Sequence, residues 1–299
     1  MKIRLSYWQK KNLGDSLSPF IVSGLSGKDV SHFDSNIDLS LTNLFTRLVY
    51  AMKRFSFLEI CHTLGSYHRH IMAIGSILEY ANRNTSVWGT GFISLNGECR
   101  AKNVYAVRGK YTAKRLEELG FDTSNIVYGD PALLLPLLVS PSKEKKHIIG
   151  IIPHWLETDK FISKYGEWLH VIDIRTDDVK AFVEDLTSCK YILSSSLHGI
   201  IIAHAYGIPA LLIQKTEEEE YGYVKYDDYF SSVDIKPYHY IDFDEKMLGN
   251  EQSIQSLFER HTGRTLPQVD VRSIQKSLLA VAPFSLKKEF CSNNSCFRN

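Results

Sequence analysis

The segment Ser194–Gly199 combines three serines and a histidine in a pattern that could hold an anion and transfer a proton. Tyr191–Leu193 precedes it and predicts a buried strand, and an apolar helix follows it. Ser195 or Ser196 is a natural N-cap, and the free N–H groups of a first helical turn attract anions. His198 would lie beside such an anion, which would raise its pKa and favour the protonated form. The structural alternative is that the serines only cap the helix and His198 only packs.

Other strand ends carry similar turns. Asn12-Leu13-Gly14-Asp15 follows the first predicted strand, Gly89-Thr90-Gly91 follows a strand ending at Trp88, and Arg108-Gly109 follows another. Arg108 suits bidentate capture of a carboxylate or phosphate, and we expect it to face a cleft. Each turn alone is a weak signal, because lone polar residues at strand ends are more often caps or ion pairs.

The elements that must position these residues are short strands alternating with helices. This order predicts parallel sheets with right-handed crossovers and ligands at the carboxyl ends of the strands. A helix is expected from about Ser18, and another over 112–119 with Thr112 as its cap. The polar segment 140–146 reads as a linker and hinge between two such series. We therefore expect an α/β fold of two Rossmann-like lobes, 1–140 and 147–265, with an interlobe cleft.

Composition excludes some functions. The chain has 299 residues and a formal net charge of +1, without the basic excess of a nucleic-acid binder. We find no signal peptide and no apolar run of the roughly 20 residues that a membrane span needs. Five cysteines without CxxC spacing indicate reduced thiols in the cytoplasm, and no Cys/His cluster has metal-ligand spacing.

Eight motifs occur in an order that resembles the polysaccharide pyruvyl transferase family, from about residue 3 to residue 282. They are Asn12–Asp15, Gly75–Ile77, Val87–Gly91, Val107–Gly109, Gly129–Pro131, Ile152–His154, Ser195–Gly199 and Lys225–Phe230. The resemblance implies a fold similar to the GT-B glycosyltransferases, with a C-terminal helix in 266–286 that packs back on the first lobe before a tail at 287–299. It also implies transfer of the pyruvyl group of phosphoenolpyruvate to two hydroxyls of a sugar, which leaves a ketal.

This resemblance assigns roles to the strand-end residues. His198 would be the central acid/base and Asp15 would orient a hydroxyl or His198. The second lobe would hold the donor through Ser195, Ser196, Leu197, Gly199 and Lys225, together with Arg108 of the first lobe. The first lobe would hold the acceptor through Asn12, Gly14 and Thr90, with His154 of the second lobe as a further acceptor-binding residue. Relatives can carry Arg where this chain has Ser196, so an anion anchor is either missing or supplied by Arg108, Arg175 or Lys225. The chemistry requires no cofactor and no metal, because phosphoenolpyruvate is a co-substrate.

The expected partners are phosphoenolpyruvate and a saccharide acceptor in a surface polysaccharide precursor for capsule or exopolysaccharide biosynthesis. Such precursors are commonly lipid-linked, which would place a cytoplasmic enzyme at the inner membrane face. Arg47, Lys53 and Arg54 surround apolar residues, either as a membrane-facing basic helix or as a solvated helix packed on its apolar side. Two other functions stay open: a glycosyltransferase that uses a nucleotide sugar, and a non-catalytic saccharide-binding relative.

Overall fold

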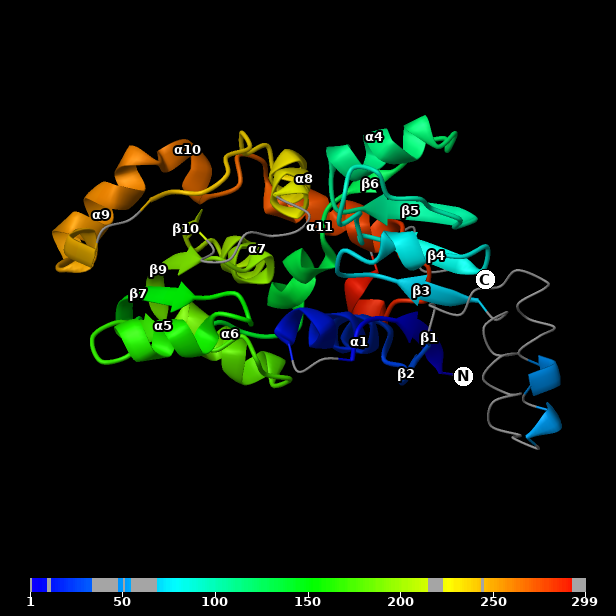
Figure 1. Cartoon of the computed structure of the whole chain (residues 1–299), viewed down its shortest axis with the longest axis horizontal. Helices are drawn as coiled ribbons and strands as arrows, with labels where there is room; N and C mark the ends of the chain where they lie inside the picture. The colour runs from blue at the N-terminus through cyan, green and yellow to red at the C-terminus, as the bar shows by residue number, and fades with distance from the viewer. Residues whose placement is uncertain are drawn as a thin grey trace.

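The structure is a computed structural model that describes residues 2–9, 12–33, 48–50, 52–54, 69–214, 223–242 and 245–291. It is a mixed α/β protein with two sheets, and every strand pair within them is parallel (Figure 1). The alternation of strands and helices in the sequence predicted this Rossmann-like character. The GT-B-like arrangement of two lobes around a cleft stays a prediction.

The first sheet contains six strands in the order β2-β1-β3-β4-β5-β6. The strands are β1 (Ile3–Ser6), β2 (Val30–His32), β3 (His70–Met72), β4 (Thr85–Trp88), β5 (Asn103–Val107) and β6 (Val127–Tyr128). The helical segments among them are α1 (Leu13–Ser26), η1 (Leu78–Tyr80), α4 (Lys110–Glu118) and η2 (Pro131–Leu137).

The second sheet contains four strands in the order β10-β9-β7-β8. The strands are β7 (His147–Ile152), β8 (His170–Val171), β9 (Cys189–Ser194) and β10 (Ala210–Leu212). The helices are α5 (Thr158–Tyr165), α6 (Val179–Thr187) and the strongly apolar α7 (Leu197–Ala205). Figure 1 shows this sheet with α5, α6 and α7 on the left and the first sheet on the right.

The C-terminal part of the chain contacts both sheets. It contains α8 (Val224–Ser232), η3 (Glu245–Leu248), α9 (Glu251–Arg260), α10 (Thr262–Thr265), α11 (Val271–Ala280) and η4 (Lys288–Phe290). The helix α8 packs against α4, and α11 packs against β6 and η2 (Figure 1). Trp88 Nε1 donates to the carbonyl oxygen of Leu278 at 2.9 Å, which anchors α11 at the end of β4.

One buried apolar cluster joins the two sheets. It includes Leu17 of α1, Leu134 of η2, Ile201 of α7 and Ile151 of β7, all 0% exposed. The segment η2 contacts both α1 and α7, so it lies between the sheets. The linker 140–146 has no regular structure, but Lys145 Nζ donates to the carbonyl oxygens of Thr187 and Cys189 at 2.9 and 2.7 Å. The linker is therefore tied to the second sheet at this point.

Two helix starts differ from the sequence prediction. α1 begins at Leu13 rather than near Ser18, because the Asn12 side chain caps it, and Pro19 lies inside the helix. α4 begins at Lys110 with Gly109 as N-cap, so Thr112 is not the cap but an internal residue of the first turn.

Three smaller expectations concern thiols and membranes. Cys99 and Cys189 are free, but Cys291 is disulfide-bonded, so the prediction of reduced thiols is wrong at Cys291. Among the described helices, none has the length and apolar character that a membrane crossing requires. Arg47 lies outside the described residues, and Lys53 and Arg54 are exposed beside exposed Met52.

Candidate active site

The N-terminus of α7 follows β9 directly, at the carboxyl edge of the second sheet. Ser196 is the N-cap residue, as the sequence predicted, but its hydroxyl makes no hydrogen bond to the helix. Ser194 Oγ accepts from the Ser196 amide at 3.0 Å and lies 2.8 Å from the carbonyl oxygens of Ile152 and Ser196. The side-chain oxygen that usually satisfies a first-turn N–H is therefore absent, and an anion can take its place.

Ser195 belongs to the frame of this turn. Its hydroxyl accepts from the His154 amide at 2.9 Å and donates to Glu157 Oε2 at 3.2 Å, and the side chain of Glu157 is buried. Its carbonyl oxygen accepts from the hydroxyl of Tyr226 at 2.8 Å. The structure therefore brings together Ser195 and His154, which were predicted to contact different substrates, and uses the Ser195 hydroxyl to join β7 to β9.

Leu197 and Gly199 serve packing. Leu197 is 5% exposed and belongs to the apolar core. A Cβ atom at Gly199 would lie 2.5 Å from Ser194 Oγ and 3.0 Å from Ile152, so only glycine fits between α7 and β7. The Leu197 side chain is used in the core and Gly199 has none, so the groups that these residues could offer an anion are their backbone N–H groups.

Gly14 of α1 lies against the imidazole of His198. A Cβ atom at Gly14 would be 2.5 Å from His198 Nδ1 and 2.8 Å from Cε1, a distance that real contacts do not reach. The turn after β1 and the turn after β9 are thus neighbours, although 184 positions separate the two residues. Asp15 follows in the first turn of α1, and the Asn12 side chain accepts from the Gly14 amide at 3.3 Å. Asn12 therefore caps α1. Asp15, the residue after Gly14, supplies the carboxyl group in the first turn of this helix.

His198 is neutral in the molecule without a bound anion. Its Nε2 atom is buried and has no hydrogen-bond partner among the described residues. Burial, together with the positive charges of Arg108 and Lys225, lowers the pKa of His198 to about 3. The protonated form that the sequence predicted therefore requires a negative charge beside the ring. The two cations that disfavour protonation are the groups such an anion would neutralise.

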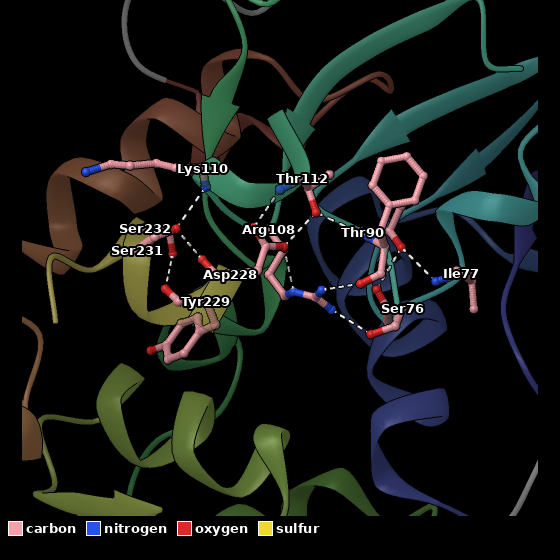
Figure 2. Close-up of polar contacts among 12 residues, drawn as sticks. Ser76, Ile77, Thr90, Arg108, Lys110, Thr112, Asp228, Tyr229, Ser231 and Ser232 are labelled. Carbon is pink, nitrogen blue, oxygen red and sulfur yellow. Dashed lines mark hydrogen bonds and ion pairs between the residues drawn. The ribbon is translucent and has the colours of Figure 1, made fainter. Parts of the chain in front are cut away.

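Arg108, at the end of β5, does not face open space as predicted but is 0% exposed. Figure 2 shows its guanidinium between Asp228 and Ser76. Nε donates to Asp228 Oδ2 at 3.0 Å, Nη1 to Ser76 Oγ at 2.7 Å and Nη2 to the carbonyl oxygen of Phe92 at 2.7 Å. Three of its five N–H donors thus bind protein oxygens. Capture of a substrate anion by Arg108 stays a prediction, and the geometry gives it a structural role first.

Thr90 also uses its side chain inside the protein. Its hydroxyl donates to the carbonyl oxygen of Gly75 at 2.7 Å and accepts from the Ile77 amide at 3.4 Å. Its own carbonyl oxygen accepts from the Arg108 amide at 3.3 Å. Thr90 is 0% exposed, and its hydrogen bonds hold the turns after β3, β4 and β5 together; acceptor binding by Thr90 stays a prediction.

The helix α8 connects the two sheets through buried side chains. The hydroxyl of Tyr226 donates to the carbonyl oxygen of Ser195, directly after β9. Figure 2 shows Asp228 beside Arg108 and Thr112, which follow β5. Asp228 Oδ1 accepts from the Thr112 amide at 2.9 Å, and Oδ2 accepts from the Thr112 hydroxyl at 2.6 Å. Asp228 therefore caps α4 from a distant part of the chain. The hydroxyl of Tyr229 lies 2.9 Å from His204 Nδ1 in α7.

Asp130 is a buried carboxyl group that the sequence analysis recorded only as part of the Gly129–Pro131 motif. Oδ1 accepts from the Ala132 amide at 2.9 Å, and Oδ2 has no partner among the described residues. Burial raises the pKa of Asp130 to about 7, against the opposing effects of that hydrogen bond and of the Arg108 charge. An aspartate directly before a proline at a strand end was the available signal. Asp130 is thus a buried carboxyl group whose pKa lies near neutral pH.

Because relatives can carry Arg where this chain has Ser196, three other cations are candidates for the anion anchor. Arg175 is bound by two carboxylates, with Nη2 at 2.8 Å from Asp159 Oδ1 and 2.9 Å from Asp173 Oδ2. Arg108 is bound by Asp228. Lys225 lies at the start of α8 with its Nζ atom 5.0 Å from the ring centroid of Tyr226, and its charge acts on His198. The charges of both Arg108 and Lys225 act on His198, and anion binding by any of the three stays a prediction.

Comparisons with known proteins agree with the order of motifs. The family model for polysaccharide pyruvyl transferases matches residues 62–214, about half of the chain. An uncharacterized protein of Acanthamoeba polyphaga mimivirus is 35% identical over 187 residues, which are 59% of this chain. The match covers 64% of that relative's length. No solved structure matches the chain.

Proposed function

The chain belongs to the polysaccharide pyruvyl transferase family, and from this premise we propose that it moves the pyruvyl group of phosphoenolpyruvate onto two hydroxyls of one sugar. The observation that carries the proposal is the meeting of His198 with the open N-terminus of α7 and the turn at Gly14. An anion site, an imidazole and the first turn of α1 converge there. Ketal formation from an anionic enol phosphate would use an anion site, a proton donor and a group that orients the sugar hydroxyl.

The donor brings two anionic groups. Phosphoenolpyruvate carries a carboxylate and a phosphate, so its site must supply opposite charge at two points. The N–H groups at the start of α7 would take one anion, and the Lys225 ammonium would take the other. Arg108 contributes its positive charge from a fixed position in the network with Asp228. In this proposal the charge of Lys225 compensates for the serine at position 196.

The reaction has to protonate carbon and deprotonate hydroxyls. A proton goes to the methylene carbon of the donor, and one sugar hydroxyl attacks the central carbon. Phosphate then leaves, and a second hydroxyl attacks the same carbon to close the ketal. Of the two protons that the hydroxyls lose, one would replace the proton given to the methylene carbon and the other would leave with the phosphate. In our proposal the bound anions offset the charges of Arg108 and Lys225, so His198 becomes protonated when the donor binds and delivers the first proton.

The acceptor would bind on the side of α1. Asp15 is half-buried in the first turn of that helix, next to Gly14, and could orient a sugar hydroxyl. Asn12 and His154 would lie at the boundary of the acceptor site, and each takes part in a hydrogen bond of its turn. We propose that the acceptor is a unit of a surface polysaccharide precursor, free or lipid-linked, which the enzyme meets in the cytoplasm at the inner membrane face.

One experiment distinguishes the proposed pyruvyl transfer from glycosyl transfer and from saccharide binding without catalysis. The purified protein is incubated with phosphoenolpyruvate and a panel of nitrophenyl and lipid-linked glycosides, and inorganic phosphate and saccharide products are measured. Acceptor-dependent phosphate release with a ketal product supports the proposal. Nucleotide release from a nucleotide sugar would identify a glycosyltransferase instead, and turnover of neither donor would identify a binding protein. Loss of phosphate release in His198→Ala at an unchanged melting temperature separates catalysis from packing, whereas near-wild-type release would place the chemistry elsewhere.

A further inference from the structure

A basic cavity lies on the first sheet, away from the strand ends that form the candidate active site. Its volume is about 770 Å³, and it is lined by the amino-terminal halves of β1, β3 and β5 and by residues 282–285 after α11. Gly14 and His198 follow the carboxyl ends of β1 and β9. Because strands of a parallel sheet share one direction, the cavity and the active site lie toward opposite edges of the first sheet.

Four cations line this cavity: Lys2, Arg4, Lys28 and Arg69. Its described lining contains no aspartate or glutamate. None of the four forms an ion pair with another described residue. The chain as a whole carries a net charge of only +1, so four unpaired cations at one cavity are a local concentration of charge. Such a concentration attracts an anionic ligand.

The rest of the lining is suited to sugars. Tyr105 and Phe284 are partly exposed aromatic side chains, and Asn103 adds an amide that can donate and accept. The ring of Phe284 is held edge-on by Trp88, at 5.1 Å between centroids and 86° between planes. A fixed aromatic ring beside polar groups binds molecules with one apolar and one polar side, as a sugar ring has.

We propose that this cavity binds a carboxylate-bearing segment of the saccharide on which the active site acts. The inference rests on the proposed function, because each ketal made from phosphoenolpyruvate keeps the carboxylate of its donor. A chain that has been modified would therefore carry negative charges that the four cations recognise. Binding it at the opposite edge of the sheet keeps the same polymer near the active site for further transfer.

The test measures binding without catalysis. Titration calorimetry uses an oligogalacturonate tetramer as the anionic probe, maltotetraose as the neutral one and inorganic phosphate as a free anion. The variant is Arg4→Gln with Arg69→Gln, and the matched control is Arg260→Gln with Arg272→Gln on exposed helix surfaces. Charged hydrogen bonds contribute about 1.5–3 kcal/mol each, so the first variant should bind oligogalacturonate at least about tenfold more weakly and the control should not change.

Several outcomes decide the matter. Equal affinity for maltotetraose, binding of inorganic phosphate as tight as that of the tetramer, or unchanged affinity in the variant would each overturn the proposal. If the Arg4 variant is unstable, Lys2→Gln with Lys28→Gln tests the same charge at exposed positions. Phosphate release with a nitrophenyl monosaccharide acceptor should be unchanged in both variants. Oligogalacturonate binding in a protein that releases no phosphate would contradict the proposed function and still support this site.

Discussion

The ends of β5 and β9 both lead into a helix but differ in how their polar groups are satisfied. After β5, Arg108 is fully buried, and its three nitrogens donate to Asp228, Ser76 and Phe92. After β9, the buried Nε2 atom of His198 has no partner among the described residues, and no side chain caps α7. One strand end holds the molecule together, and the other leaves hydrogen-bonding capacity unused.

Whether a buried polar group has hydrogen-bond partners distinguishes structural from functional residues better than residue type does. Buried polar groups in proteins are almost always hydrogen-bonded, so an unsatisfied group at a strand end needs an explanation. A substrate that completes the missing contacts is one explanation, and it applies to His198. Arg108 has the residue type expected of an anion ligand, but its neighbours already supply the opposite charge.

The largest effect on stability should come from a substitution that removes the hydrogen bonds at the end of β5. Asp228→Ala removes the partner of Arg108 and both acceptors of Thr112, which leaves a buried charge uncompensated. Removal of one partner from a buried ion pair costs about 3–5 kcal/mol, so we expect a loss of that size in the free energy of unfolding, measured with urea.

The matched control is Glu118→Ala, which removes an exposed pair with Arg115 from the same region and should change stability by less than about 1 kcal/mol. If Asp228→Ala fails to fold, the double variant Arg108→Met/Asp228→Leu should recover a folded protein, because it removes both charges. A loss in Asp228→Ala no larger than that of the control would show that the buried pair does not hold α8 to the first sheet.

The sequence allowed most of the strands and the turn from β9 to α7 to be predicted, because apolar runs, glycines and caps are local signals, but it did not indicate the short strands β2 and β8. It did not predict the start of α1, since Pro19 is compatible with a helix start yet lies inside the helix. It also could not show that the first turn of α4 is capped by Asp228, 116 positions from Thr112. The hydrogen bonds of the Arg108 guanidinium also come from residues distant in the sequence, and no local pattern encodes such contacts.

A smaller effect is expected at the contact between the two turns. Gly14→Ala would place a Cβ atom 2.5 Å from His198 Nδ1, so the ring must move. Displacement of a catalytic group by about 1 Å can cost about 100-fold in rate, and we expect a loss of about 10- to 100-fold in phosphate release. Stability should change little, because alanine favours the helix while the clash opposes it.

Gly263→Ala in α10 is the control, since a Cβ atom there meets no atom within 4 Å. Activity and stability of this variant should equal those of the wild type. Unchanged phosphate release in Gly14→Ala, with its melting temperature also unchanged, would mean that the position of the His198 ring does not matter for turnover.

The smallest effect is a proton taken up when the donor binds. In the free molecule the pKa of His198 is lowered to about 3, so the ring is neutral at pH 7. A bound anion favours the charged form, and a rise of the pKa toward 7 would add up to about half a proton per molecule at pH 7. Calorimetric titration with phosphoenolpyruvate in buffers of different ionisation enthalpy measures this number as a slope. Because the folded pKa rises only with the donor bound, donor affinity should weaken as the pH increases through that value.

His198→Gln provides the reference, because glutamine does not titrate and the donor's own phosphate contributes equally in both proteins. Asp130, whose pKa is raised to about 7, can also take up a proton, so Asp130→Asn is measured in parallel. The asparagine keeps the oxygen that accepts from the Ala132 amide. A slope that falls in His198→Gln assigns the proton to the unsatisfied end of β9. A slope that falls only in Asp130→Asn would instead make Asp130 the proton carrier and leave His198 as a neutral hydrogen-bonding group.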